Sequence, residues 1–306
     1  MKHHTREDFL NAFGRVLDTQ YRLRQECPWD KKQTFESLRP NSIEEMYELC
    51  DAIMKHDAKN ICKELGDVLE HIVFYAMMGA EEGEFDIADV CNGLADKLMF
   101  RHPFINWNES KGNWGIDNRV YTVASADLQI NSLGQVVYRN SAVDQQLTQK
   151  PEDASGVELT WEQIKQKERD GNTSVLSGVP ESLPSLIKAT RIQEKAHNVG
   201  FDFKQADDAW KKVHEELLEL EAEIKHKDKD KSTGELGDFI FSLVNVARFY
   251  HLNPDTALER TNQKFIRRFN YIEQKVKEQH KKFGDLTLEE MDAFWNEAKK
   301  LENEKK

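Results

Sequence analysis

The sequence predicts an all-α protein made of two tandem helical bundles, joined by an irregular insertion with room for a short β hairpin. The chain has 306 residues, of which only 15 are Gly and 7 are Pro, whereas 32% are charged. Such a composition favours helices over strands. Apolar side chains also recur at three- and four-residue spacing through most of the chain, which is the period of amphipathic helices. A third observation, an internal repeat, indicates that there are two helical domains.

Four apolar stripes mark the clearest helices. Each stripe repeats every three or four residues, so its side chains share one face of a helix, and we expect that face to pack in a core. The stripes are Ile43, Met46, Tyr47, Cys50, Ile53 and Met54; Leu65, Val68, Leu69, Ile72, Val73 and Ala76; Val213, Leu217, Leu220 and Ile224; and Leu236, Phe239, Ile240, Leu243, Val244 and Ala247.

One segment, residues 105–157, lacks this helical period. It is rich in Asn, Ser, Gly and Gln, and two β-prone runs at 120–123 and 135–138 flank a turn-forming stretch at 131–134. A helix is expected at 159–169, followed by turn-rich sequence. The predicted plan is therefore a helical domain at 1–104, an insertion and linker at 105–179, and a second helical domain at 180–306.

Composition also disfavours several classes of protein. The net charge of −12 argues against a protein that binds nucleic acid through its phosphates. No run of 18 apolar residues occurs, and the polar first ten residues do not resemble a signal peptide, so we expect no membrane contact. The four cysteines show neither metal-type pairing nor the density of a disulfide scaffold. The expectation is a reduced, cytoplasmic protein.

Two copies of one acidic pattern carry the functional argument. Residues 44–48 (Glu-Glu-Met-Tyr-Glu) match 215–219 (Glu-Glu-Leu-Leu-Glu) at an offset of 171, and 64–67 (Glu-Leu-Gly-Asp) match 235–238 at the same offset. Downstream, a Lys-x-x-x-Arg pair occurs in both copies, at an offset of 167, as Lys97 with Arg101 and Lys264 with Arg268. The four-residue contraction is expected in a loop, near 78–86 against 250–255. This order of motifs indicates an ancient duplication.

Carboxylates at this spacing predict a divalent metal site in each half. Residues i and i+3 share a helix face, so Glu45 and Glu48 point the same way, as do Glu64 and Asp67 on the next helix. If the two helices pack antiparallel, the carboxylates converge and repel one another, and a hard cation removes that penalty. Oxygen ligands favour Mg²⁺, with Mn²⁺ as a substitute, over zinc.

A single Glu-x-x-Glu is usually a solvated helix face, as we expect for Glu221 and Glu223. The ordered recurrence of three motifs changes that interpretation, because the Lys-x-x-x-Arg pairs, one helical turn apart, suit the remaining charge of a polyphosphate. Gly66 and Gly237 lie inside the predicted helices, where Gly costs about 1 kcal/mol relative to Ala. We expect a close helix approach beneath the carboxylates to explain them.

With these motifs the sequence resembles the MazG family of nucleoside triphosphate pyrophosphohydrolases. The resemblance covers nearly all of both halves and departs at residues 105–157, where the insertion is longer than the family's linker. Besides the acidic motif pairs, it includes residues 27–34 (Cys-Pro-Trp-Asp-Lys-Lys-Gln-Thr), 101–103 (Arg-His-Pro), 161–165 (Trp-Glu-Gln-Ile-Lys) and 198–202 (Asn-Val-Gly-Phe-Asp).

The resemblance implies an all-α NTP-pyrophosphohydrolase fold, homodimers, Mg²⁺ dependence, and conversion of an NTP or dNTP and water into the monophosphate and pyrophosphate. It implies metal ligation in the second half by Glu216, Glu219, Glu235 and Asp238, with the matching first-half set Glu45, Glu48, Glu64 and Asp67. It also implies that phosphates, base and sugar are held by Lys231, Lys264, Arg268 and Trp295, with Lys97 and Arg101 as first-half matches. For Trp295 the alternative is a hydrophobic anchor for the C-terminal helix. Glu44 and Glu215 complete the motif as candidates either to support the metal ligands or to act on water. The expected catalytic set is Glu215, Glu216, Glu219, Glu235, Asp238, Lys264 and Arg268.

The two halves differ at positions that bear on catalysis. Lys231 aligns with Asn60, and Trp295 has no evident first-half counterpart because its offset falls in the insertion. We therefore expect the second half to carry most turnover, in an enzyme of nucleotide-pool house-cleaning or stress-linked nucleotide control. The alternatives are a narrower dCTP, dUTP or phosphoribosyl-ATP pyrophosphohydrolase, and a non-catalytic Mg-nucleotide-binding regulatory scaffold.

Overall fold

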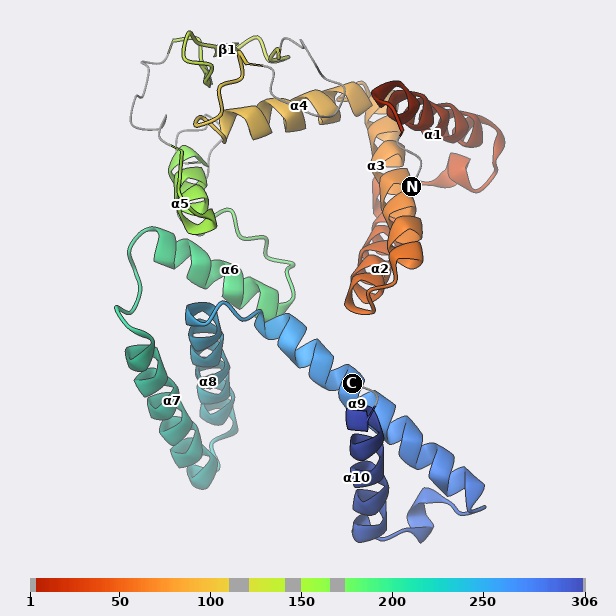
Figure 1. Cartoon of the computed structure of the whole chain (residues 1–306), viewed down its shortest axis with the longest axis vertical. Helices are drawn as coiled ribbons and strands as arrows, with labels where there is room; N and C mark the ends of the chain where they lie inside the picture. The colour runs from red at the N-terminus through yellow and green to blue at the C-terminus, as the bar shows by residue number, and fades with distance from the viewer. Residues whose placement is uncertain (1–3, 110–120, 141–149, 166–173, 305–306) are drawn as a thin grey trace. The chain divides into compact units, whose positions relative to one another are not determined.

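The computed structural model describes residues 4–109, 121–140, 150–165 and 174–304 (Figure 1). The chain divides into two compact units, Met1–Ile164 and Lys165–Lys306. Helices dominate both units, and a small hairpin provides the two strands among the described residues. The all-α class with tandem helical units is confirmed. In the described part of the chain, no helix has the length and apolar character that crossing a membrane requires.

In the first unit, α2 and α3 pack side by side as a helical hairpin, α1 packs on α3, and α4 leaves the end of α3 (Figure 1). The hairpin strands lie against α4. In chain order the elements are α1 (Arg6–Glu26), the short 3₁₀ helix η1 (Asp30–Lys32), α2 (Phe35–Met54), α3 (Ala58–Glu82), α4 (Ile87–Phe100), β1 (Leu128–Ile130), β2 (Val136–Tyr138) and α5 (Ala154–Lys165).

The second unit repeats the helical hairpin as α7 and α8. Helix α6 packs on α8 and on α9, and α10 folds back along α9 (Figure 1). The elements are α6 (Ser185–Asn198), α7 (Ala206–His226), α8 (Lys229–Phe249), α9 (Pro254–Glu278), the 3₁₀ helix η3 (Phe283–Asp285) and α10 (Leu288–Glu304).

The repeat found in the sequence is also a repeat of helix boundaries. Helices α2 and α7 begin 171 residues apart, as do α3 and α8. The caps match too, because Asp57 and Asp228, also 171 apart, each accept backbone N–H groups at the start of α3 and α8. Helix α9 begins 167 residues after α4, and the caps Asp86 and Asn253 keep that offset. Local sequence therefore starts each helix at the same place in both halves.

The four-residue contraction does not lie in a loop, contrary to expectation. Helix α3 has 25 residues and α8 has 21, whereas the segments that follow them, 83–86 and 250–253, are equally long. The second half has lost about one helical turn from the end of α8. Four residues are close to the 3.6 residues of one helical turn. The difference therefore changes the length of the helix, whereas the residues on either side keep nearly the same helix face.

The insertion contains the expected hairpin, but with a different first strand. Strand β2 pairs antiparallel with Leu128–Ile130 in the register Leu128↔Tyr138, and residues 121–123 form no strand. Tyr121 and Val123 pack their side chains on the cluster of Met99, Leu128 and Val136 instead. The turn at 131–134 is confirmed, because Asn131 and Gln135 close it with a backbone bond of 2.8 Å and Gly134 takes φ +80°.

The helix expected at 159–169 begins earlier than predicted, at Ala154, and is described as far as Lys165. Residues 166–169 of that expectation lie outside the described residues. The structure groups α5 and the insertion with the first helical unit.

The four stripes are helical as expected, but the prediction that their faces are core is wrong for many members. Tyr47 is 60% exposed and Leu65 is 53% exposed, and the second half behaves alike. A two-helix hairpin covers only one face of each helix, so residues such as Val73, Val213 and Val244 are buried while the outer faces stay open. The exposed stripe members are Ile43, Met46, Tyr47, Cys50, Ile53, Leu65, Ile72, Leu217, Ile224, Leu236, Ile240 and Leu243.

Candidate functional site

The acidic motifs meet where α2 and α3 pack against each other in the first unit. Glu45 and Glu48 come from α2 and Glu64 from α3, and one carboxylate oxygen of each lies within 4.8 Å of the others. Glu64 is 6% exposed, whereas Glu48 remains open to solvent. A buried carboxylate beside exposed ones suits a cation that also keeps other ligands.

The second unit builds a similar group between α7 and α8, which includes Asp238, the counterpart of Asp67, in place of the counterpart of Glu48. Glu216, Glu235 and Asp238 bring one oxygen each within 4.8 Å of the others, and Glu216, like Glu64, is the buried member at 5% exposed. Of the eight carboxylates predicted to ligate metal, six therefore converge. Asp67 and Glu219 stand beside these groups: Asp67 pairs with Lys63, and Glu219 is near enough to influence Glu235.

Crowding changes the acidity of one carboxyl in each group. Burial first, and then the charges of Asp67 and Glu48, raise the pKa of Glu45 above its ordinary value. Burial, followed by the charges of Glu219 and Glu216, likewise raises the pKa of Glu235. Both shifts report carboxylates that are partly withdrawn from water and close to other negative charges, a condition that a divalent cation relieves.

A lysine partly neutralises each group, and sequence reasoning missed both lysines. Lys63 Nζ lies 2.9 Å from Glu64 Oε2 and 3.0 Å from Asp67 Oδ2. Lys212 Nζ lies 2.8 Å from Glu215 Oε1 and 2.5 Å from Glu216 Oε1. These contacts raise the pKa of both lysines. The i, i+4 spacing of each lysine to an acidic residue was the available signal.

The two mid-helix glycines do not mark a close approach of helices. A Cβ built on Gly66 or Gly237 would meet nothing within 4 Å. The expectation of tight packing beneath the carboxylates is therefore wrong within this chain. Because each glycine lies between two acidic residues of the motif on an open face, its missing side chain leaves the space beside the carboxylates free.

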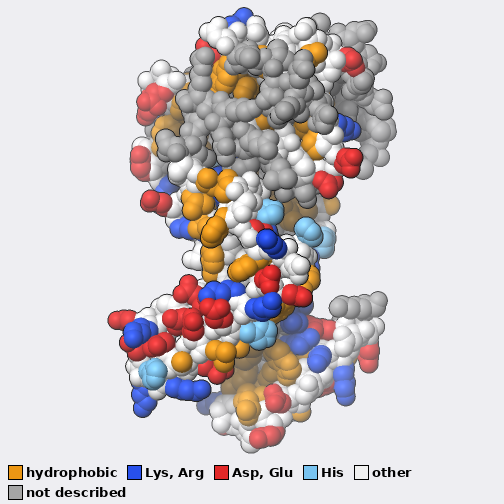
Figure 2. Space-filling model, turned by 90° about the vertical axis from the view of Figure 1, so that its left-hand side faces the viewer, with side chains coloured by type: hydrophobic (Ala, Val, Ile, Leu, Met, Phe, Trp, Pro, Cys, Tyr) orange, Lys and Arg blue, Asp and Glu red, His pale blue; other side chains and the backbone are white. Residues whose placement is uncertain are grey.

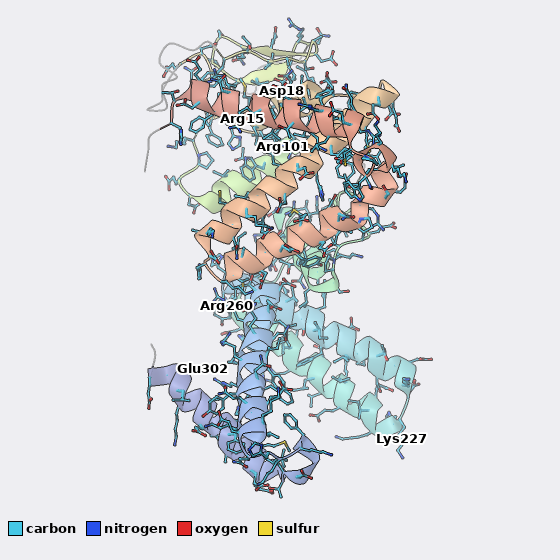
Figure 3. All side chains as sticks on the ribbon, turned by 90° about the vertical axis from the view of Figure 1, so that its right-hand side faces the viewer. Arg15, Asp18, Arg101, Lys227, Arg260 and Glu302 are labelled. Carbon is cyan, nitrogen blue, oxygen red and sulfur yellow. The ribbon has the colours of Figure 1, made fainter. Side chains whose placement is uncertain are left out.

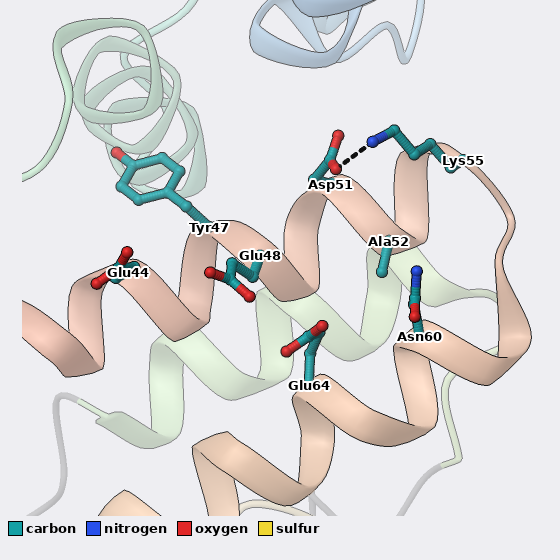
Figure 4. Close-up of a pocket in the computed structure, with 8 residues that line it drawn as sticks. All are labelled: Glu44, Tyr47, Glu48, Asp51, Ala52, Lys55, Asn60 and Glu64. Carbon is teal, nitrogen blue, oxygen red and sulfur yellow. Dashed lines mark hydrogen bonds and ion pairs between the residues drawn. The ribbon is translucent and has the colours of Figure 1, made fainter.

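A pocket of ≈ 560 Å³ opens beside the first group, between α2 and α3 (Figure 4). Its walls include Glu48 and Glu64 together with Tyr47 and Asn60, and Asp51 and Lys55 form an ion pair of 2.5 Å at its rim. The second unit has Leu218 and Lys231 at the offsets of Tyr47 and Asn60. The residues beside the carboxylates therefore differ between the two units.

Apart from Lys231, which lies on α8 with Glu235 and Asp238, the predicted phosphate-binding residues lie on other helices than the carboxylates. Lys264 and Arg268 are on α9, and Arg268 donates to Glu302 Oε2 from Nε (2.9 Å) and Nη2 (2.7 Å). The Arg268 guanidinium also lies over the Trp295 ring, 5.3 Å from its centroid. Lys231, at the start of α8, is exposed and 3.9 Å from Asp228. Glu302, which orients Arg268, was not singled out from the sequence.

In the first unit, Lys97 is exposed on α4 and Arg101 is its half-buried C-cap (Figure 3). Helix α4 runs away from the α2–α3 pair, as α9 runs away from α7–α8 (Figure 1). At 1.5 Å per residue, Lys264 stands about 15 Å along α9 from its start. The structure therefore brings the carboxylates together within each unit, but it does not bring the Lys-x-x-x-Arg pair to them.

Hydrophobic side chains share the surface with the charged ones (Figure 2). On α8, Leu236, Ile240 and Leu243 are 46%, 42% and 37% exposed, and on α9 Phe265 and Ile266 are 55% and 54% exposed. These residues lie on the helices that carry the carboxylates and the cations. Apolar surface of this extent usually marks a contact with another molecule.

Comparison with known proteins agrees with the motifs. The MazG nucleotide pyrophosphohydrolase domain matches residues 33–105 and 205–272, which are the segments that hold the carboxylates and the Lys-x-x-x-Arg pairs. The nucleoside triphosphate pyrophosphohydrolase of Escherichia coli K12 is 35% identical over 96% of this chain and 99% of its own length.

Two further relatives extend over most of the chain. The nucleoside triphosphate pyrophosphohydrolase/pyrophosphatase MazG of Thermotoga maritima is 34% identical over 89% of both chains. An uncharacterized protein of Bacillus subtilis is 39% identical over 90% of this chain and 49% of its own length. With a matched domain in each half, in the order that the repeat predicts, this chain belongs to the MazG family of nucleotide pyrophosphohydrolases.

Proposed function

We propose that this chain is a cytoplasmic, Mg²⁺-dependent enzyme that hydrolyses nucleoside triphosphates to the monophosphate and pyrophosphate. The observation that carries the proposal is the group of three converging carboxylates in each unit, with two of the three at matched positions and each group followed along the chain by Lys-x-x-x-Arg. Relatives named for this activity align over nearly the whole chain, which supports the same reaction here. Its role would be the house-cleaning or stress-linked control of nucleotide pools.

The donor set fits Mg²⁺. The candidate ligands that converge in each group are carboxylate oxygens, and burial together with the neighbouring carboxylates raises the pKa of Glu45 and of Glu235. Hard divalent cations prefer such ligands, and Mn²⁺ is the expected substitute. The ion would be held by Glu216, Glu219, Glu235 and Asp238 in the second unit, and by Glu45, Glu48, Glu64 and Asp67 in the first.

When bound, Mg²⁺ would offset the charge of the triphosphate and of the pyrophosphate leaving group. Glu215, exposed and 2.8 Å from Lys212, is the candidate to accept a proton from the attacking water. Lys231 and Lys264 would bind phosphate oxygens, as would Arg268 through the guanidinium donors that Glu302 leaves available. Trp295 would stack on the base. The water oxygen forms a bond to the α phosphorus. The bond between that phosphorus and the α–β bridging oxygen breaks, and pyrophosphate leaves with the bridging oxygen.

The second unit is proposed as the main catalytic site. Lys231 supplies a cation at the position where the first unit has the neutral Asn60. A further positive charge beside the triphosphate favours binding and helps to stabilise charge that develops on the leaving group.

We also propose that the functional form is a homodimer. Within each unit the carboxylates and the Lys-x-x-x-Arg pair lie on diverging helices, and both carry exposed apolar side chains. A second copy that covers these faces would supply the cations that one chain holds away from its own carboxylates.

Product analysis tests the reaction. The purified chain is incubated with each NTP and dNTP in Mg²⁺, and the products are separated by ion exchange. Equal amounts of monophosphate and pyrophosphate are expected, with no turnover in EDTA. Orthophosphate in place of pyrophosphate would contradict the proposed bond cleavage, and binding without turnover would favour a regulatory scaffold. Activity confined to dCTP, dUTP or phosphoribosyl-ATP would identify a narrower enzyme.

A further inference from the structure

One helix closes each half of the chain after the matched carboxylate and cation helices. In the second half it is α10, which carries Trp295, and in the first half it is α5, which carries Trp161. The two helices match in sequence at an offset of 134, with Val157 and Met291, Trp161 and Trp295, Ile164 and Ala298, Lys165 and Lys299, and Glu168 and Glu302 in register. Glu168 lies outside the described residues, so its match is one of sequence alone.

The offset explains why the linear repeat missed this pair. Arg268 follows Arg101 by 167 residues, whereas Trp295 follows Trp161 by 134, so the first-half connection is 33 residues longer. That extra length is the insertion, which occupies the place of the short η3 connection between α9 and α10. Once it is discounted, the helices of both halves follow in the same order.

Burial supports the same register. Residues at i, i+4 and i+7 share one helix face, and here the i+7 residues are Ile164 in α5 and Ala298 in α10. Both are buried, Ile164 at 2% exposed and Ala298 at 5%. The tryptophan one turn before it is half-buried in both cases. Each helix therefore uses the same face to hold an indole against its unit.

Both indoles also contact residues next to the Lys-x-x-x-Arg motif, in the middle of α9 in one case and just past the end of α4 in the other. The Trp295 ring lies 5.2 Å from the Phe265 ring, with the Arg268 guanidinium carbon 5.3 Å from its centroid. The Trp161 ring lies 5.3 Å from the ring of His102, the residue that follows Arg101. Tryptophan thus stands beside the Lys-x-x-x-Arg motif in each half, although the matched domain ends at residues 105 and 272 and includes neither tryptophan.

Trp161 carries a further sign of an absent partner. Its Nε1 is buried, and no described residue accepts its hydrogen bond. Buried indole N–H groups are normally paired, so the site offers a donor to an oxygen or nitrogen of a bound molecule. The half-buried indole ring of Trp161 offers a surface on which an aromatic base can stack.

We propose that α5 is the first-half counterpart of α10 and that Trp161 binds the base of a nucleoside triphosphate in the first unit. The inference rests on the proposed function, because it takes the triphosphate as the ligand of the Lys97 and Arg101 motif. It assigns α5 to the first nucleotide site. The two halves are then alike in base stacking, and Lys231 in place of Asn60 still distinguishes them.

The test isolates the first site in the full-length chain. Glu235→Gln with Asp238→Asn disables the second carboxylate group, and calorimetry measures the binding of α,β-methylene-ATP and of inorganic tripolyphosphate in Mg²⁺. In this background, Trp161→Ala is expected to weaken the nucleotide analogue by about 5- to 100-fold, the usual range for the loss of one base stack. Tripolyphosphate, which has no base, is expected to keep its affinity, and Trp161→Phe to recover most of the nucleotide affinity.

Equal weakening of both ligands would show that Trp161 only supports the fold and would overturn the proposal. An unchanged affinity for the nucleotide analogue would overturn it as well, as would a failure of that analogue to bind the background chain. Pyrophosphate release by the unaltered chain is measured separately, so a failure of the proposed catalytic function is distinguishable from a failure of this site.

Discussion

At the scale of single residues, each carboxylate group is stabilised by a lysine that the other half lacks. Lys63 falls at the offset of Gly234, and Lys212 falls at that of Asn41. The two halves therefore neutralise their acidic groups with lysines at different positions. Each lysine stands at i, i+4 spacing to an acidic residue. Because the two lysines are partly exposed, they can withdraw when a stronger cation arrives.

Metal binding should stabilise the fold in a pH-dependent way. A carboxyl with a folded pKa above its unfolded value adds stability at low pH, and that contribution is lost as the pH rises through the raised pKa. The raised pKa of Glu45 and of Glu235 thus means that, without metal, these two carboxyls lower the free energy of unfolding near neutral pH. We expect Mg²⁺ to raise the Tm, and to raise it more at pH 8 than at pH 5.

Thermal unfolding in MgCl₂ and in NaCl of equal ionic strength measures this effect. Glu216→Gln with Glu235→Gln should remove the second unit's share of the gain, whereas Glu221→Gln, the same change at an exposed position of α7, should keep it. Equal Tm values in the two salts would rule out the predicted metal sites.

Catalysis should depend on the second group more than on the first. Glu219→Ala and Glu235→Gln are each expected to lower kcat/KM by at least about 100-fold, the upper range for disturbed metal sites. Glu48→Ala and Glu64→Gln should cost less, because the first unit lacks the cation of Lys231. Initial rates of pyrophosphate release measure both pairs. Full activity in Glu219→Ala together with inactivity in Glu48→Ala would reverse the assignment.

At the scale of elements, the described residues 121–140 of the insertion attach to α4. The buried Asp96 carboxylate accepts backbone N–H groups of Ala124 (3.0 and 3.1 Å) and Ser125 (2.7 Å). The Trp107 indole N–H donates to the carbonyl oxygen of Met99 at 3.2 Å. These hydrogen bonds connect residues of the insertion to α4, the helix that carries Lys97.

Removal of the Asp96 carboxylate should loosen that attachment. Asp96→Ala leaves two backbone donors without their acceptor, at a cost of about 1–3 kcal/mol each. We expect trypsin to cut after Arg139 at least about 10-fold faster, because the hairpin opens more often. Mass spectrometry of the fragments over time measures the rate, and Asn92→Ala, at an exposed position of α4, is the control. Unchanged cleavage would show that Asp96 does not hold the insertion.

At the scale of the whole molecule, the chain exposes apolar stripes that a lone two-helix hairpin cannot cover. Ile240 and Phe265 are 42% and 55% exposed on helices of the second unit. Full burial of an exposed Ile or Phe side chain contributes roughly 1.5–3 kcal/mol, so a second copy that covers the exposed half of each would gain about half of that per side chain. The same contact would place cations and carboxylates from different helices together.

Sedimentation tests that assembly. The chain should sediment at twice its 35.6 kDa mass, and Ile240→Glu should shift it toward the monomer and lower pyrophosphate release at low protein concentration. Lys300→Glu, a charge change at an exposed position of α10, should leave the mass as it was. A fully active monomer would contradict the proposed homodimer.

Local sequence was enough to predict the helices α2, α3, α7 and α8, the acidic motifs on shared faces and the repeat. Helix period, caps such as Asp57 and Asp228, and spacings of three or four residues act within a few turns, so each is readable from neighbouring residues. The turn at 131–134 was likewise predictable, because Asn131 and Gly134 close it locally.

Contacts between distant segments decided the rest. Only packing shows that the outer faces of the stripes stay open, that Arg268 is held between Glu302 and Trp295, and that Tyr121 joins a cluster instead of a strand. The place of Trp161 beside His102 depends on how the insertion folds between α4 and α5. Periodicity states which residues share a face, but the tertiary structure alone states what lies opposite that face.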